Sequence, residues 1–325
     1  MASASRPPVE FGGIPQILDI LKSQGYIADR DLATSVHLSV VLNKPLLIEG
    51  EAGVGKTEVA KVMARALDTE LIRLQCYEGL DVHTALYEWN YQRQMLRIKL
   101  EETNGRPVEE KEHVIFSEPF LLKRPLLQAI TADRAPVLLI DEVDRADEEF
   151  EAFLLEVLSD FQVSIPEIGT IRARQIPYVV LTSNRTRELS DALRRRCLYL
   201  WIDYPTFEKE LRIVHTKVPQ INDDLANQIC AFMQLVRTAS LSKVPGVAET
   251  LDWSAALMAL HRDHLDVQAV EETLGCLCKD QEDVVRVRAQ YLGPILETIN
   301  TMGTTGDGWT SERIASLAAQ LPKSR

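Results

Sequence analysis

The fold is indicated by one stretch of the sequence, Pro45-Leu-Leu-Ile-Glu-Gly-Glu-Ala-Gly-Val-Gly-Lys-Thr57. It begins as a short apolar run, continues as a glycine-rich segment that matches the pattern G-x4-G-K-[ST], and leads into a helix predicted over residues 56–67. A glycine-rich turn that binds nothing would not need a strand before it and a helix after it. The order of strand, loop and helix therefore predicts a phosphate-binding loop.

The chemistry of such a loop rests on its backbone. Its N–H groups can wrap phosphates because glycines have no Cβ to clash, and the helix that follows adds the positive end of its dipole. Lys56 is expected to reach the β- and γ-phosphates of ATP, and the Thr57 hydroxyl is expected to bind Mg2+. The residues predicted to contact the nucleotide are Gly50, Glu51, Ala52, Gly53, Val54, Gly55, Lys56, Thr57, Glu58 and Asp141.

A second apolar run, Pro136-Val-Leu-Leu-Ile140, is typical of a strand in a parallel sheet with both faces covered. Asp141 and Glu142 follow it, and open α/β sheets bind ligands at the carboxyl ends of their strands. We expect Asp141 to hold Mg2+ beside Thr57, directly or through water, and Glu142 to polarise an attacking water. Two adjacent acids could alone be a solvated turn, but with the phosphate loop upstream they favour hydrolysis over transfer to an alcohol.

Polar and basic residues follow the next apolar run. Because a neighbouring strand would bring its tip close to the γ-phosphate, Asn184 can orient the water, although an ordinary turn or cap is the alternative. Three consecutive arginines stand at Arg194, Arg195 and Arg196. Such a run is usually a solvated face or a phosphate contact, and the sharper interpretation is an arginine supplied to the site of a neighbouring subunit.

Composition excludes several classes of protein. The chain has 325 residues, 46% of them hydrophobic, so it can bury a large core. Its formal charge of −12 argues against broad nonspecific binding of nucleic acid or anionic lipid. Five cysteines without paired CxxC spacing argue against a disulfide framework or a zinc module. The start lacks a signal sequence and no apolar run suits a membrane span, so we expect a cytoplasmic protein.

The order of patterns predicts the domain organisation. Strand and helix patterns alternate to about residue 205 and only helical patterns follow, which indicates an α/β fold with a helical appendage. We expect a lead-in at 1–14, an α/β ATPase domain at 15–205 and a helical lid domain at 206–325. Within the ATPase domain we expect an irregular insert at about 76–118 that contains a helix at 86–100, then a helix at 119–130 and a hairpin at 161–174. In the lid domain the predicted helices include one at 281–300.

Two further groups of side chains allow more than one interpretation. Four aromatic residues in the predicted insert could pack in a core or grip another protein: Tyr77, Tyr87, Trp89 and Tyr91. His261 and His264 stand three residues apart in a predicted helix and could share a metal. No carboxylate or cysteine pattern surrounds the two histidines, which argues against a metal site there.

This ordered set of motifs resembles the AAA+ ATPases, and more narrowly their MoxR branch. The resemblance covers about residues 15–265, and the MoxR features include Phe116-Ser-Glu-Pro-Phe120 and a hairpin directly before the Asn184 strand. Closer still, Tyr87-Glu-Trp-Asn-Tyr-Gln-Arg-Gln94 and Leu198-Tyr-Leu-Trp-Ile-Asp-Tyr-Pro205 resemble the CoxD-like subgroup, whose members are associated with molybdenum-containing CO dehydrogenase-type hydroxylases.

The resemblance implies a homo-hexameric ring with ATP between subunits, in which Glu142 and Asn184 act on ATP bound by their own subunit. The arginine from the neighbour would be Arg196, with Arg195 as second choice. The family's lid usually adds an arginine that contacts the γ-phosphate, but Thr250-Leu-Asp-Trp-Ser-Ala256 contains none. The resemblance also implies a chaperone that works with a von Willebrand factor A domain protein on a client metalloenzyme, here a molybdenum hydroxylase.

Three other functions fit parts of the sequence. A small-molecule kinase shares the strand, loop and helix, but Glu142 and the all-helical C-terminal part argue against it. A DNA-acting AAA+ motor would usually add a basic stripe or a DNA-binding domain, neither of which the sequence indicates. A nucleotide-gated scaffold that hardly hydrolyses ATP is disfavoured by the full set of hydrolytic residues.

Overall fold

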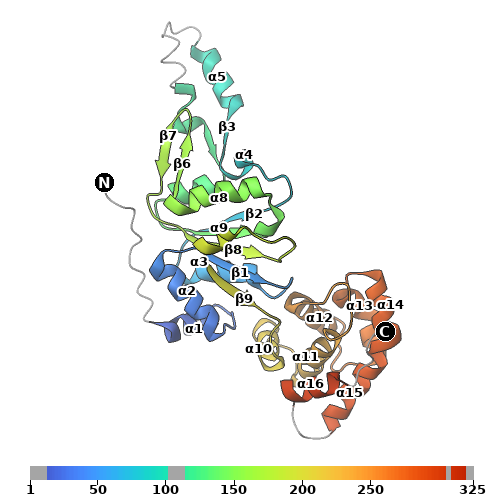
Figure 1. Ribbon diagram of the computed structural model, residues 1–325. Coiled ribbons are helices and arrows are strands. Elements are labelled where there is room, and N and C mark those ends of the chain that lie inside the picture. Colours follow the sequence, from blue (N-terminus) through green and yellow to red (C-terminus); the bar gives the residue numbers. More distant parts are fainter. Residues whose placement is uncertain (1–12, 102–113, 305–308, 320–325) are drawn as a thin grey trace. The chain divides into compact units, whose positions relative to one another are not determined.

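The computed structural model of the protein describes residues 13–101, 114–304 and 309–319 (Figure 1). Most of the predicted lead-in and residues 102–113 of the predicted insert lie outside these ranges. The chain forms two compact units: the first contains Ala28–Gly50 and Lys56–Trp201, and the second contains Glu51–Gly55 and Ile202 onward. The predicted fold class is confirmed, because one unit is a sheet between helices and the other is helical.

The first unit is built on a five-stranded sheet. Its strands are β1 (Leu46–Gly50), β2 (Leu71–Gln75), β5 (Val137–Asp141), β8 (Tyr178–Ser183) and β9 (Leu198–Ile202), in the order β2-β5-β8-β1-β9. The pairs β1–β8, β5–β8 and β2–β5 are parallel. All residues of β1, β5 and β8 are buried, as expected for strands covered on both faces.

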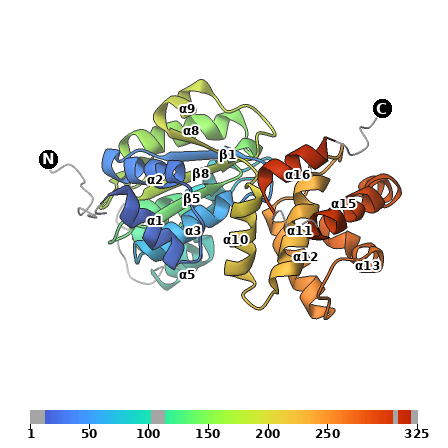
Figure 2. The ribbon, with the colours of Figure 1, turned by 90° about the horizontal axis from the view of Figure 1, so that it is seen from below.

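Helices cover both faces of this sheet. Helices α1 (Ile14–Ser23) and α3 (Lys56–Ala66) lie on one side, and α8 (Glu148–Asp160) and α9 (Asp191–Arg196) lie on the other (Figure 2). Helix α2 (Arg30–Leu42) contacts β1, and helix α7 (Pro125–Thr131) contacts β2 and β5. A short 3-10 turn, Val143–Arg145, separates β5 from α8.

The insert differs from the sequence prediction. The expected helices at 86–100 and 119–130 are wrong in part, because Tyr87–Trp89 (β3) pairs antiparallel with Leu121–Lys123 (β4). Helix α4 (Val82–Ala85) precedes this ribbon, α5 (Tyr91–Glu101) follows β3, and a 3-10 turn, Glu118–Phe120, precedes β4. The apolar residues here have helical spacing, but the two segments, which are distant in sequence, form a strand pair instead.

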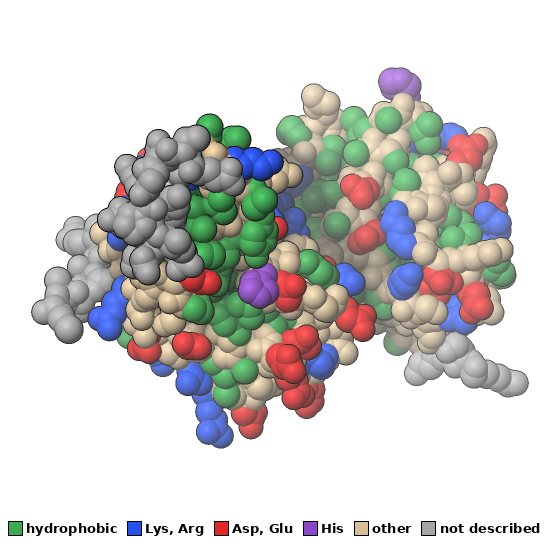
Figure 3. All heavy atoms as spheres, turned by 90° about the horizontal axis from the view of Figure 1, so that it is seen from above, with side chains coloured by type: hydrophobic (Ala, Val, Ile, Leu, Met, Phe, Trp, Pro, Cys, Tyr) green, Lys and Arg blue, Asp and Glu red, His purple; other side chains and the backbone are tan. Residues whose placement is uncertain are grey.

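Of the aromatic residues in the insert, Trp89 is buried and meets Phe116 edge to face. Tyr77 and Tyr91 are exposed instead, and Met95, Leu96 and three further apolar residues nearby are exposed with them: Ile98, Leu100 and Leu122. Figure 3 looks onto this end of the first unit, where hydrophobic side chains are visible among charged ones. Core packing therefore explains Trp89 but not the two tyrosines.

The predicted hairpin forms as β6 (Gln162–Ile165) and β7 (Gly169–Arg172), paired antiparallel with Ile165 opposite Gly169. Gly169 has φ +93°, a backbone conformation that suits glycine at this turn. The buried side chains of Val163 and Ile165 join the core of the first unit.

The second unit is helical and has its own core, which includes Phe232, Trp253 and Tyr291. Its helices are α10 (Phe207–Lys217), α11 (Asp223–Val236), α12 (Val247–Ala259), α13 (Val267–Leu277), α14 (Gln281–Arg286), α15 (Leu292–Thr304) and α16 (Ser311–Ala318). A π-helical turn, Val287–Tyr291, interrupts the single helix predicted at 281–300. Within the described residues, no helix is long and apolar enough to cross a membrane.

Candidate functional site

The glycine-rich loop leaves the sheet at Gly50 and enters α3 at Lys56. Gly53 and Gly55 have φ angles of +75° and +93°, conformations that residues with a Cβ rarely adopt. The Lys56 side chain is 6% exposed, and its Nζ donates to the Gly50 carbonyl at 2.7 Å. The loop therefore curls around the lysine that the sequence assigned to the phosphates.

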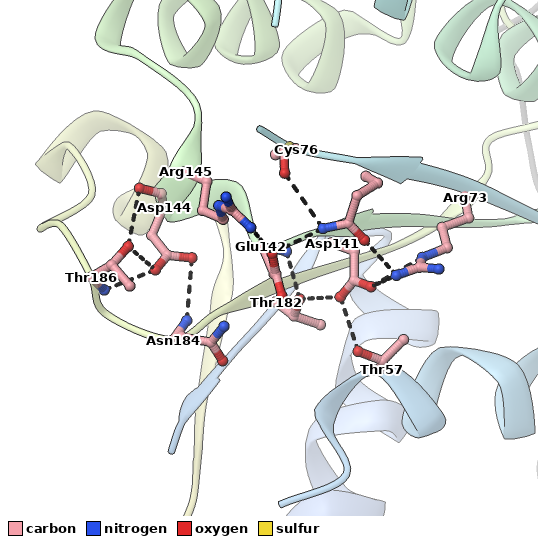
Figure 4. Close-up of polar contacts among 11 residues, drawn as sticks. Thr57, Arg73, Cys76, Asp141, Glu142, Asp144, Arg145, Thr182, Asn184 and Thr186 are labelled. Carbon is pink, nitrogen blue, oxygen red and sulfur yellow. Dashed lines mark hydrogen bonds and ion pairs between the residues drawn. The ribbon is translucent and has the colours of Figure 1, made fainter. Parts of the chain in front are cut away.

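Asp141 stands at the carboxyl end of β5, where three side chains converge on it (Figure 4). The hydroxyls of Thr57 and Thr182 donate to Oδ1 at 3.0 and 2.6 Å. Arg73 donates to Oδ2 through Nε at 3.0 Å and through a terminal nitrogen at 2.6 Å. Asp141 is 2% exposed, so these contacts compensate much of the cost of burying its charge.

The donor set at Thr57 and Asp141 fits Mg2+. A hydroxyl and a carboxylate oxygen are the hard oxygen ligands that this ion prefers, and one or two protein ligands suffice because Mg2+ also binds water and phosphate. The 3.0 Å between Thr57 Oγ1 and Asp141 Oδ1 places both atoms where they could contact one cation. The structure thus brings together the two residues predicted to touch the metal.

Glu142 adopts φ +55°, a left-handed conformation that is uncommon for a residue with a side chain. Its backbone N–H donates to Thr182 Oγ1 at 2.9 Å. Its carboxylate oxygen Oε2 accepts from Gln75 at 3.0 Å and from Arg145 at 3.1 Å. The side chain is 33% exposed, so the carboxylate is oriented by the protein yet reachable by water.

Asn184 follows β8, and Asp144 fixes its backbone. Asp144 Oδ1 accepts from the Asn184 N–H at 3.2 Å, and Oδ2 accepts from the N–H and hydroxyl of Thr186 at 2.8 and 2.7 Å (Figure 4). Asp144 is 2% exposed, and hydrogen bonds accepted by a carboxylate are stronger than those between neutral groups. Because Glu142 and Asn184 follow the neighbouring parallel strands β5 and β8, both residues lie at the same edge of the sheet.

Cys76 lies beneath these acids. It is fully buried, and its backbone N–H donates to the Asp141 carbonyl at 2.8 Å. Burial, followed by the negative charges of Asp141, Asp144 and Glu142, raises the pKa of the Cys76 thiol to about 12. The thiol is therefore neutral near pH 7 and does not act as a nucleophile there.

The three arginines of α9 have different surroundings. Arg194 donates to the buried carboxylate of Glu49 at 3.1 and 3.3 Å. Arg196 donates to Ser159 at 2.9 Å and to the Ala192 carbonyl at 3.2 Å. Arg195 is exposed, and among the described residues its side chain has no hydrogen bond or ion pair. Arg195 is therefore the member of the run that is free to reach another molecule.

The structure does not assemble a metal site from the histidines. Helix α12 ends at Ala259, so His261 and His264 lie beyond it, and His261 has φ +54°. The His264 ring pairs with Asp263 at 2.6 Å. Among the described residues, no group of three or more His, Cys, Asp or Glu side chains could hold a metal ion.

The sequence did not indicate four residues that complete the site: Arg73, Gln75, Asp144 and Thr182. Gln75 is in register with Asp141, and Ile140 is in register with Leu181, so Thr182 comes next to Asp141. The only signal in the sequence was the position of Gln75 and Thr182 at the ends of predicted strands. Choosing them required knowing which strands are neighbours.

A strand, a phosphate loop and a helix, with an acidic pair at the end of another parallel strand, define a P-loop nucleoside triphosphatase. The comparisons narrow this class. Residues 45–197 match the family model described as the AAA domain of the dynein-related subfamily. Residues 45–197 are therefore similar to an AAA+ ATPase domain, as the sequence motifs indicated.

The chain is also similar to uncharacterized proteins of staphylococci. It is 26% identical over 263 residues to one from Staphylococcus haemolyticus, an alignment that covers 78% of this chain and 90% of the relative. It is 26% identical over 241 residues to one from Staphylococcus aureus, covering 72% and 82%. Among solved structures, the Holliday junction branch migration motor RuvB of Thermotoga maritima aligns over 94% of this chain and 89% of RuvB, with 18% identity and a TM-score of 0.43.

Proposed function

We propose that the protein hydrolyses ATP to ADP and phosphate in a Mg2+-dependent reaction. The observation that carries this proposal is the Asp141–Glu142 pair, in which one carboxylate is buried beside Thr57 and the next is oriented but open to water. A carboxylate placed in this way can accept the proton of an attacking water. A kinase would instead need such a base beside the hydroxyl group of an acceptor substrate.

Each residue of the site then has a distinct task. Lys56 binds the β- and γ-phosphates, Thr57 and Asp141 hold Mg2+, and Asn184 orients the water. When bound, Mg2+ would neutralise charge on the phosphates. Glu142 takes the proton of the water, and its Oε2 accepts hydrogen bonds from Gln75 and Arg145 before the reaction.

We further propose that the site is completed by a neighbouring copy in a homo-hexameric ring. The free guanidinium of Arg195 supports it as the residue that reaches across, while the bonds of Arg196 to Ser159 and its own helix make it the second candidate. An arginine supplied in trans would stabilise negative charge that develops on the transferred phosphoryl group.

The resemblance to MoxR-type proteins of the CoxD-like subgroup supports a cellular role. We propose a chaperone that acts with a von Willebrand factor A domain protein to mature a client metalloenzyme, such as a molybdenum hydroxylase. The exposed apolar side chains on α5 are compatible with contacts to another protein.

ATP turnover per subunit, measured as a function of protein concentration, tests the proposal. We expect turnover to rise with protein concentration. We expect Arg195→Ala to lower turnover at least about 100-fold, a smaller loss than the roughly 1,000-fold or more for arginines supplied in trans, because no partner protein is present in this assay. Arg134→Ala is the matched control, because Arg134 is 73% exposed and its guanidinium contacts only Asp68 among the described residues, through the carbonyl at 2.8 Å and the carboxylate at 3.8 Å. If wild type, Arg195→Ala and Arg196→Ala all have the same turnover, the proposal that a neighbouring subunit supplies an arginine is overturned.

A further inference from the structure

The tip of the phosphate loop makes main-chain hydrogen bonds to α12. Residues Glu51–Gly55 pack in the second unit, and the Gly53 carbonyl accepts from the N–H groups of Val247 and Ala248 at 3.0 and 3.2 Å. These are the first two residues of α12, whose N–H groups have no acceptor inside their own helix. The Gly53 carbonyl therefore takes the place of a helix-capping group.

Two glycines allow this close approach. A Cβ on Gly246 would lie 2.7 Å from the Ala52 carbonyl oxygen and 2.8 Å from Gly53 Cα, closer than real Cβ contacts. Because both are backbone atoms, the loop or the helix would have to move. A Cβ on Gly53 would meet Gly246 Cα at 3.2 Å, so the pair fits only without side chains.

A buried network holds the amino end of α12 in place. Glu249 accepts from the Gly246 N–H at 2.8 Å, and Arg237 Nε donates to the Pro245 carbonyl at 2.8 Å. Arg237 also binds the fully buried Glu210 through two bonds of 2.6 and 2.7 Å. Such a bidentate pair has a fixed geometry, so the segment that meets the loop is rigidly supported.

This contact determines the orientation of one peptide group in the loop. A trans peptide is planar, and its C=O and N–H point in opposite directions. The described residues contain no cis peptide bond. Because the Gly53 carbonyl points at α12, the N–H of Val54 points away from α12.

We propose that the amino end of α12 positions the phosphate loop for nucleotide through the Gly53 carbonyl. Gly246 and Val247 are thus positioning residues for ATP binding. Helix α12 contains the segment 250–256, which lacks the arginine expected of a lid, and Thr250 there instead donates to Glu210 at 2.6 Å. The backbone contact supplies a connection to the loop that needs no such arginine. This inference rests on the proposed ATP-binding function.

The sharpest test is Val247→Pro in the full chain. Val247 is the first helical residue, a position that accepts proline, and Gly246 before it is extended (φ −91°, ψ −168°), as a residue before proline prefers. The change removes one of the two donors to the Gly53 carbonyl and leaves that of Ala248, while α12 stays helical. Val267→Pro is the matched control, because Val267 is the exposed first residue of α13 and follows the extended Asp266.

The readout is the Kd for a fluorescent non-hydrolysable ATP analogue, with melting temperatures measured without nucleotide. We expect Val247→Pro to weaken binding about tenfold, the order expected for one backbone hydrogen bond lost with its buried carbonyl left short of a donor, while Val267→Pro binds as wild type. Should Val247→Pro melt well below Val267→Pro, Gly246→Ala replaces it, with Gly275→Ala as control because nothing lies within 4 Å of a Cβ there.

The outcomes separate the two claims. Wild-type protein that does not bind the analogue overturns the proposed function and this inference together. Wild-type binding with an equal Kd in both Val247→Pro and Gly246→Ala overturns the inference alone. Weaker binding in either variant, with its control unchanged, supports it.

Discussion

Gln75 Nε2 donates a hydrogen bond to Glu142 Oε2 at 3.0 Å, across the ends of β2 and β5. Gln75 is in register with Asp141, so the strand pairing that builds the sheet also places an amide against the next residue. Arg145 donates to the same oxygen at 3.1 Å. One carboxylate oxygen of Glu142 is therefore engaged by two donors and is less available to accept a proton from water.

Removing the amide should release that oxygen. We expect Gln75→Ala to raise basal ATP turnover by about threefold, within the energy of one hydrogen bond to a charged group, without changing the Kd for ATP. Steady-state phosphate release measures it. Gln128→Ala is the control, since Gln128 is an exposed amide whose Nε2 donates to the Lys123 carbonyl. A fall in turnover would mean that Gln75 serves the reaction rather than restrains it.

Thr182 links the two acids, since its hydroxyl donates to Asp141 at 2.6 Å and accepts from the Glu142 N–H at 2.9 Å. Thr182→Val keeps the shape but leaves both groups without this partner. We expect it to lower the free energy of unfolding by about 1–3 kcal/mol and turnover by about tenfold. Denaturant titration and phosphate release measure the two effects. Thr182→Ser, which keeps the hydroxyl, should recover most of both; if it behaves as the valine variant does, the hydroxyl is not responsible.

Glu208 joins α10 to α16 within the second unit. Its carboxylate accepts from the Ser311 hydroxyl at 2.6 Å and from the Ser311 N–H at 2.8 Å, and these bonds lower its pKa from 4.5 to about 2. A lowered pKa in the folded protein means that the stabilisation is present above pH 4.5 and is lost as pH falls toward 2.

Hydrogen exchange of the α16 amides across that pH interval, corrected for intrinsic rates, should therefore show protection that falls in wild type. Glu208→Gln has no carboxylate to titrate, so its protection should be lower at the start and change less. The same pH dependence in both proteins would contradict the role of Glu208.

The sheet and the main motifs could be predicted because local sequence determines them. The run Val137–Ile140 is apolar throughout because both faces of β5 are covered, and Asp141 follows at the exact point where the strand ends. The glycine spacing of the phosphate loop is equally local, since Gly53 and Gly55 adopt conformations that suit glycine. These features need no knowledge of distant residues.

The insert and the residues that support Asp141 and Glu142 could not be predicted, because both depend on contacts between segments that are distant in sequence. Tyr87–Trp89 became a strand because Leu121–Lys123 pairs with it, and the partner lies more than thirty residues away in the chain. Thr182 and Gln75 touch the acids only through the register of three strands. The contact of Gly53 with α12 joins segments that are still further apart in sequence.

In the proposed reaction, Glu142 accepts the proton of the attacking water. Glu142→Gln keeps the size of the side chain and removes the base, so it should bind ATP as wild type does and lose at least about 100-fold in turnover. Lys56→Ala is the contrasting variant, which should lose ATP binding itself. The decisive measurement is single-turnover phosphate release by Glu142→Gln at saturating ATP. A rate at least about 100-fold below wild type supports Glu142 as the base, and a rate equal to wild type contradicts that role.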